Sequence, residues 1–496
     1  MKLIRLFLSV VCFSLLLNAC APGEDVIGSP KNERYVNSWI MNTLSSYYYW
    51  NDQLPKKSDM TLHPKEYFKS IIYNYNPITA PDGDRFSWIV EDYTKLVASL
   101  NGIVSKEIGF DMSLYYKDDR TIYLIGQVNY VKKGTPAEAS GIKRGMYFDR
   151  INGTVLTYNN YTDLLNIKTA DVTVGFVDPV FDTNGKLTNF SNATEKTLQT
   201  VSDYAENPVY LDTVITMNNS KIGYFVYNFF SPDKGADPGE QTGDFAYDLE
   251  MNDVFGRFKT AGITDLILDL RYNSGGHTSS AQLLASEMVP NVSNTQLFAF
   301  YRYNSIINPQ FSPEQLKTYF TTKVLNGTTQ IGTVNNVGNQ IGGKVYILTG
   351  HFTASASEQI INGLKPYMDV ILVGDTTYGK NVASTTFSDK GDGYDNTDKN
   401  KWGMQPIIAK YFNSLGKSDF TAGFAPDFVV KDGGLNMKEF GDLNEPLLNT
   451  ALNDILGTQV LPIVQKRAET IQTDKLLSLP GKRIRGAQLD NLPFFE

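Results

Sequence analysis

The chain has 496 residues, a length that normally divides into about two to four domains rather than one core. Hydrophobic residues make up 42% of it and charged residues 20%, which is the composition of a globular protein and argues against extensive disorder. The net charge is -8 and no basic run stands out, so nucleic acid is not expected as a main partner.

Residues 1–20 have the features of a lipoprotein signal peptide. Lys2 and Arg5 precede an apolar stretch at 6–17, which is shorter than the roughly 20 residues that span a membrane. The segment 1–20 ends in "LLNAC", so we expect cleavage before Cys20 and a lipid on that cysteine. Residues 21–33 then read as a tether from the membrane. This predicts a protein of the bacterial cell envelope, anchored on the periplasmic or the cell-surface side, with no cysteine left for a disulfide or a nucleophile.

The next two regions differ in their periodicity. Residues 34–98 have helical spacing, with one helix expected from Tyr35 to about Leu54 and another over 64–73. Residues 99–198 contain short β-type runs such as "DVTVGFV", separated by Gly, Asp and Asn turns. A small helical region followed by a β-rich domain is therefore predicted.

Residues 199–455 alternate strands and helices. Runs such as "ITDLILDL" (263–270), "KVYILTG" (344–350) and "DVILVGD" (369–375) are continuous apolar strands, and the stretch "SEQIINGLKPYM" between the last two is helical. This order predicts a mostly parallel sheet with crossover helices, that is, an α/β core within an α/β and α+β multidomain protein. Residues 456–496 are predicted to form a C-terminal extension without a clear element.

Parallel strands place their carboxyl ends at one edge of the sheet. Three loops that follow such strand ends contain residues suited to catalysis. "HFTASAS" contains Ser355, "TTYGK" ends in Lys380, and "RYNSGG" supplies the bare backbone of Gly275 and Gly276. We therefore expect Ser355 as nucleophile and Lys380 as its base. The N–H of Ala356 and that of Gly275 or Gly276 would form the oxyanion hole. The amine can accept a proton only if burial lowers its pKa from about 10.4 to about 7–8.

These motifs carry a family resemblance. The runs "TASASEQIINGLK", "VILVGDTTYGK" and "LILDLRYNSGG" together resemble the carboxy-terminal processing, or tail-specific, serine protease family. The segment "IGFDM" with "KGTPAEASGIKRGMYFDRINGTVL" resembles a PDZ domain. The resemblance implies a ClpP/crotonase-like catalytic core and a Ser–Lys dyad formed by Ser355 and Lys380. It also implies peptide or unfolded-protein substrates.

The PDZ resemblance implies further that Ile108, Gly109 and Phe110 present backbone N–H groups to the C-terminal carboxylate of a substrate. The chain departs from the family pattern at one position. Many members have a glutamine four residues after the lysine, where this chain has Ser384 as a possible orienting residue.

Several alternatives stay open at this stage. His351 and His277 lie near the same motifs, so a Ser–His esterase is a rival chemistry. A catalytically inactive, PDZ-containing peptide-binding surface lipoprotein is a second alternative, favoured by Ser384. Neither a cofactor nor a metal is expected, since no zinc pattern is present and "DKGDGYDNTDKN" (389–400) lacks the terminal glutamate of a calcium loop.

Overall fold

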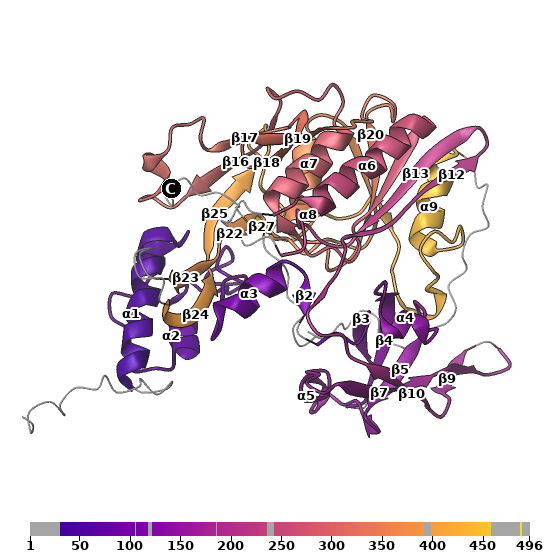
Figure 1. Ribbon diagram of the computed structural model, residues 1–496, viewed down its shortest axis with the longest axis horizontal. Coiled ribbons are helices and arrows are strands. Elements are labelled where there is room, and N and C mark those ends of the chain that lie inside the picture. The colour runs from indigo at the N-terminus through magenta and orange to yellow at the C-terminus, as the bar shows by residue number, and fades with distance from the viewer. Residues whose placement is uncertain are drawn as a thin grey trace, which may run out of the picture.

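The computed structural model describes residues 30–104, 106–117, 122–184, 186–235, 243–390, 398–457 and 487–488. The predicted signal peptide and most of the tether (residues 1–29), nearly all of the C-terminal extension and residues 391–397 of the acidic loop lie outside this description. Within it the chain forms a mixed α/β multidomain protein, as the sequence predicted (Figure 1).

The N-terminal region is helical but not self-contained. Its elements are α1 (Pro30–Tyr47), η1 (Asn51–Gln53), α2 (Pro64–Ile71), β1 (Trp88–Val90) and α3 (Tyr93–Leu100). The first helix ends seven residues before the expected Leu54, and a 3₁₀ turn occupies that interval. The strands β23 (Phe387–Lys390) and β24 (Asp398–Gln405) of the distant chain complete its fold, because β24 pairs with β1.

Residues 103–205 form a β-rich unit, the name used below for this segment. Its sheet has the strand order β10-β7-β5-β4-β3, so β3 is an edge strand. The elements of the sheet and its two short helices are β3 (Phe110–Tyr116), β4 (Leu124–Val131), α4 (Pro136–Ala139), β5 (Tyr147–Ile151), β6 (Thr154–Val155), α5 (Tyr161–Leu164), β7 (Asp171–Val177) and β10 (Thr194–Gln199). Its remaining strands are the hairpin β8 (Pro179–Phe181) with β9 (Leu187–Phe190), and the pair β2 (Ile103–Val104) with β11 (Tyr204–Ala205).

The large domain is built on a six-stranded sheet in the order β12-β13-β14-β20-β21-β26. All neighbours from β13 onward are parallel, as predicted, and β12 is the antiparallel edge. The bounds are β12 (Val209–Met217), β13 (Ser220–Tyr227), β14 (Asp265–Asp269), β20 (Lys344–Thr349), β21 (Asp369–Gly374) and β26 (Phe428–Val429).

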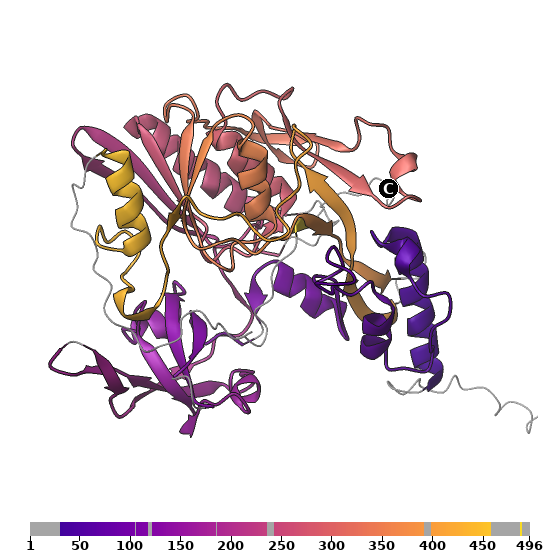
Figure 2. The same ribbon diagram turned by 180° about the vertical axis from the view of Figure 1, so that it is seen from behind.

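Helices cover both faces of this sheet, which explains why its strands are apolar throughout. One face buries Phe258 of α6 (Ala246–Ala261), Leu284 of α7 (Thr278–Met288) and Ile360 of α8 (Ala356–Leu364). The opposite face buries Leu448 and its neighbours on α9 (Pro446–Ile455), seen from behind in Figure 2. Among the described residues, none of the helices combines the length and hydropathy required to cross a bilayer.

A second sheet stands beside the carboxyl edge of the first, in the order β15-β27-β22-β25-β16-β17. Its bounds are β15 (Gly276–His277), β16 (Leu297–Tyr303), β17 (Lys317–Tyr319), β22 (Val382–Ser384), β25 (Ile407–Phe412) and β27 (Ala487–Gln488). A further hairpin, β18 (Lys323–Asn326) with β19 (Thr329–Thr333), and two short turns, η2 (Asn308–Gln310) and η3 (Gly434–Asn436), complete the described elements.

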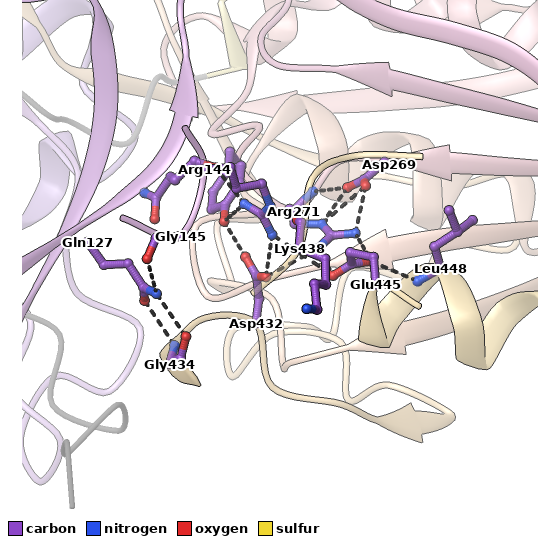
Figure 3. Close-up of polar contacts among 12 residues, drawn as sticks. Gln127, Arg144, Gly145, Asp269, Arg271, Asp432, Gly434, Lys438, Glu445 and Leu448 are labelled. Carbon is purple, nitrogen blue, oxygen red and sulfur yellow. Dashed lines mark hydrogen bonds and ion pairs between the residues drawn. The ribbon is translucent and has the colours of Figure 1, made fainter. Parts of the chain in front are cut away.

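A buried cluster of charges joins the large domain to the β-rich unit (Figure 3). Arg271, directly after β14, bonds to Asp269 at 2.8 Å and to Glu445 at 2.6 Å. Arg144 of the β-rich unit donates to Asp432 at 2.6 Å and to the Tyr272 hydroxyl at 2.6 Å. The cluster therefore fixes the start of the loop that follows β14 from two sides.

Candidate active site

The three loops predicted to converge do so through direct hydrogen bonds. The Thr353 hydroxyl donates to the Leu270 carbonyl at 2.8 Å. The Asn273 carbonyl accepts the Ala354 N–H at 3.2 Å and the Ser357 hydroxyl at 3.0 Å. The loop after β21 joins them, because the Tyr378 N–H donates to the Thr353 carbonyl at 2.9 Å. Parallel topology brought the loops to one edge, and these bonds fix their relative positions.

One buried carboxylate connects the two predicted catalytic residues. Oε2 of Glu358 accepts the N–H of Ser355 at 2.8 Å and the N–H of Lys380 at 2.8 Å. The two backbone nitrogens therefore cannot lie farther apart than these two bonds laid end to end. Oε1 accepts the Gly379 N–H at 2.6 Å and the Thr377 hydroxyl at 2.6 Å. Both oxygens act as acceptors, the arrangement of an ionised carboxylate.

A second bridge acts on the other side of the same residues. The Tyr411 hydroxyl on β25 lies 3.0 Å from the Ser355 carbonyl and 2.7 Å from the Lys380 carbonyl. Sequence analysis missed both bridging residues. Glu358 lies inside the quoted motif, and its signal was the capping-box spacing from Ser355 at the start of a helix. Tyr411 carried no local signal.

Ser355 is fully buried and sits at the N-cap of α8. Its φ is +58° and its ψ is -111°, a backbone conformation that a residue with a side chain rarely adopts. Such strain costs about 1–3 kcal/mol and persists only where neighbours impose it. The Glu358 bond to its N–H does this here. A sharp, strained turn between strand and helix is also how the G-x-S-x-G elbow of other hydrolases presents a serine, although that motif is absent from this sequence.

Lys380 has the properties required of a neutral base. The side chain is buried at 2% exposure, and this desolvation lowers the pKa of its amine to about 8, against the opposing charges of Asp84 and Glu358. The amine lies 4.9 Å from the ring centroid of Phe86. Tyr378 packs against Phe86 with ring centroids 6.0 Å apart.

The N-terminal region thus supplies part of the site, which sequence analysis did not foresee. Phe86 covers the amine, and Asp84 is buried beside it. Arg85 donates to the Gly379 carbonyl at 3.0 Å and to the Thr421 carbonyl at 3.0 Å, which fastens this segment to the lysine loop. The stretch lies outside both predicted helices, so periodicity could not reveal its role.

The oxyanion donors need one correction. The Gly275 N–H donates to Oδ1 of its neighbour Asn273 at 2.9 Å, so it is already used within the loop. Gly276 remains as the loop's candidate, with a φ of +140° and so little room that a Cβ would lie 2.1 Å from the Phe230 carbonyl oxygen. Ala356 is the first residue of α8, where helix N–H groups point out of the helix end.

Ser384 is buried on β22, and its hydroxyl accepts a hydrogen bond from Nε2 of Gln405 at 3.1 Å. Gln405 in turn accepts the Thr386 hydroxyl at 2.7 Å. The hydrogen bond described for Ser384 is thus to Gln405 and not to the Lys380 amine, and its orienting role stays a prediction.

The histidines are placed differently from a Ser–His pair with a carboxylate. His351 is exposed, and its ring packs against Tyr378 and Phe352, each with centroids 5.7 Å away. His277 is buried, with Nε2 3.2 Å from Oδ1 of Asn101 at the end of α3. Its described partner is an amide oxygen.

The predicted peptide-binding residues Ile108, Gly109 and Phe110 are buried where β3 begins. The Gly109 N–H donates to the Glu107 carboxylate at 2.8 Å. One of the three groups assigned to a substrate carboxylate therefore already has a carboxylate partner within the chain.

Two family models match the chain. Peptidase family S41 matches residues 221–430, and the Peptidase S41 N-terminal domain matches residues 35–88. The chain belongs to peptidase family S41. It is a serine-type peptidase, and the match to residues 221–430 includes all three converging loops.

One solved structure agrees with this assignment, and a second shows a weaker similarity. An S41 protease from Bacteroides fragilis NCTC 9343 is 26% identical, with 84% of this chain and 97% of that chain covered and a TM-score of 0.63. The photosystem II D1 C-terminal processing protease is 16% identical, with 86% of this chain and 99% of that chain covered and a TM-score of 0.46. The N-terminal match explains why residues 35–88 pack against the lysine loop as part of one peptidase.

The lowered pKa of Lys380 predicts a pH dependence for a peptidase that uses this amine as its base. An amine with a pKa of about 8 accepts a proton only when neutral, so kcat/KM should rise with pH and level off above about 8. Asp84→Asn removes a charge that favours the protonated amine, so this acid limb should move to lower pH. Initial rates on a fluorogenic peptide between pH 6 and pH 10 test this (range chosen to bracket the pKa of about 8). An acid limb that stays in place in the variant would contradict the charge assignment.

Glu358→Gln should lower kcat by about a hundred-fold, because an amide cannot accept from backbone N–H groups on both of its atoms and the two loops lose their register. The remaining activity should show its acid limb at lower pH, because a negative charge near Lys380 is lost. Glu287→Gln is the matched control. Glu287 is also a fully buried glutamate, but it lies on α7, outside the two loops that Glu358 joins. Equal loss of activity in both variants would reduce the role of Glu358 to folding.

Proposed function

We propose that the chain is an endopeptidase that cleaves peptides or unfolded proteins with a Ser355–Lys380 dyad. The observation that carries the proposal is the shared Glu358 oxygen, which holds the backbones of a strained buried serine and of a buried lysine of lowered pKa together. Nucleophile and base then need no histidine or metal.

The reaction would proceed by acyl transfer. The Ser355 oxygen attacks the peptide carbonyl carbon while its proton passes to the neutral Lys380 amine. The negative oxygen that develops is stabilised by the Ala356 N–H at the start of α8 and by the Gly276 N–H. When the C–N bond breaks, Lys380 returns the proton to the leaving nitrogen. A water molecule, deprotonated by Lys380, then releases the acyl group as a free carboxylate and restores the serine.

The surroundings favour an extended peptide as substrate. β15 follows the glycine loop and β22 follows Lys380, and the space between them takes an extended segment of the chain itself. That segment, β27, runs parallel to both neighbours, with Ala487 opposite Gly276 and Ala383. Main-chain pairing on both sides recognises a backbone rather than a side chain.

The remaining parts of the proposal concern location and substrate capture. We propose that Cys20 carries a lipid and anchors the enzyme to a membrane of the bacterial cell envelope, with residues 21–33 as tether. The β-rich unit is proposed to act as a PDZ-like module that captures substrate on β3, the edge strand of its sheet. The assignment of Ile108, Gly109 and Phe110 to a substrate terminus remains a prediction.

Ser355→Ala and Lys380→Ala should each lower the cleavage of denatured casein by at least a thousand-fold, because each removes one half of the dyad. His351→Ala should change the rate by no more than a few-fold. Purified protein lacking residues 1–20 is suited to the assay. Turnover that survives Lys380→Ala but not His351→Ala would instead establish a Ser–His esterase chemistry, and no cleavage by any form would favour a peptide-binding lipoprotein.

Cys20→Ser should release the protein from membranes, because the acyl chains are its proposed anchor. The full chain expressed in a bacterial host should sediment with the envelope fraction and incorporate labelled palmitate, whereas the variant should do neither. A variant that sediments as the parent chain does would show that something other than Cys20 holds the protein to the membrane.

A further inference from the structure

The β-rich unit already contains a carboxylate at the place where a peptide terminus was expected. Glu107 is 5% exposed, and its Oε1 accepts the Gly109 N–H at 2.8 Å. Its backbone is fixed by a reciprocal pair of 2.9 Å bonds with Val201. Gly109 is closely packed on its other side, because a Cβ there would lie 2.6 Å from both Thr135 and Ala137. The side chain of Glu107 thus already accepts the hydrogen bond from the N–H group that a substrate carboxylate would need.

The charges around Glu107 oppose a second carboxylate. Lys132 pairs with Glu107 at 2.6 Å and with Glu206 at 3.3 Å, and all three residues are buried. Asp111 also acts on this amine, and together the acidic groups hold the pKa of Lys132 above its usual range. Three carboxylates therefore face one ammonium group. A substrate terminus would add a fourth negative charge to this desolvated site.

The rest of the binding surface does not depend on a carboxylate. Among the described strands, β3 pairs only with β4, which leaves its other edge for main-chain bonds to an incoming strand. Along β3, Met112 and Tyr116 are half-buried and apolar. Tyr116 stacks on Tyr158 at 6.3 Å, and Tyr158 packs at 6.3 Å against Tyr161 of α5, which extends this apolar surface.

We propose that the β-rich unit captures an internal, extended segment of its substrate as a strand on β3, and that Glu107 takes the place of a C-terminal carboxylate. The inference rests on the proposed peptidase function, since the captured segment belongs to its substrate. It assigns the substrate class as unfolded chains read along their length, with alternating apolar side chains, and not as free C termini. An enzyme with this module needs no particular terminus on the proteins that it degrades.

The test compares two peptides that differ only at their ends. A short fluorescein-labelled peptide, alternating Ser with Val, Leu or Tyr, is made with a free C-terminal carboxylate and as the C-terminal amide. Binding to the full chain carrying Ser355→Ala is followed by fluorescence anisotropy, and hydrogen exchange locates the site. The two Kd values should agree within about two-fold, and both peptides should slow exchange over β3 (Phe110–Tyr116).

Glu107→Ala, added to Ser355→Ala, should vacate the Gly109 N–H and remove one of the three carboxylates that face Lys132. The acid peptide should then bind about ten-fold more tightly than the amide. Glu138→Ala is the matched control, because Glu138 also accepts a glycine N–H, that of Gly134 at 2.8 Å, but at the surface. This control should leave both affinities unchanged.

Three results would overturn the inference: a ten-fold preference of the parent chain for the acid peptide, no gain in Glu107→Ala, or no protection of β3 by either peptide. Because binding is measured without turnover, these results are independent of casein cleavage. Loss of one proposal therefore does not imply loss of the other.

Discussion

The site depends on one carboxylate accepting hydrogen bonds from two loops. Ser355 and Lys380 emerge from different strands, and nothing in the sheet itself fixes the distance between their backbones. Glu358 does so, because one of its oxygens bonds to the N–H of each. The same bonds impose the positive φ of Ser355. Backbone strain, loop register and the negative charge near the amine thus share one cause, and all four donors satisfy a group that would otherwise be costly to bury.

The pKa of the Lys380 amine results from opposing effects. Burial favours its neutral form, while the charges of Asp84 and Glu358 and the face of Phe86 favour the ammonium. A pKa near 8 corresponds to roughly 3 kcal/mol of preference relative to water. Without the two carboxylates the pKa of the amine would be lower still. Without the cover from the N-terminal region the amine would be protonated throughout the neutral range. A useful base lies between these limits.

Features that depend on local sequence patterns could be predicted, whereas those that depend on contacts between distant residues could not. The parallel sheet and the meeting of the loops at its carboxyl edge were predictable, because apolar strands and crossover helices are local patterns with few topologies. Ser355 and Lys380 followed from the same reasoning. Phe86 could not be found this way, because it lies almost three hundred residues from Lys380 in the sequence. Tyr411 could not be found either, because it lies on a strand of the second sheet that carries no motif. Their role comes from tertiary contacts alone.

The oxyanion loop shows the same limit at the level of single atoms. The sequence "RYNSGG" predicted bare N–H groups, yet Asn273 uses one of them to shape its own turn. The first residues of this loop belong to an ion cluster in which Arg271 bonds to Asp269 and Glu445 while Arg144 reaches Tyr272 from the β-rich unit. Such clusters add little net stability, because the desolvation of each charge offsets the attraction. They do penalise every arrangement that leaves a charge unpaired. The loop that completes the site therefore keeps its conformation because other conformations would leave a buried charge unpaired. The charges concerned belong both to the catalytic domain and to the unit proposed to capture its substrate.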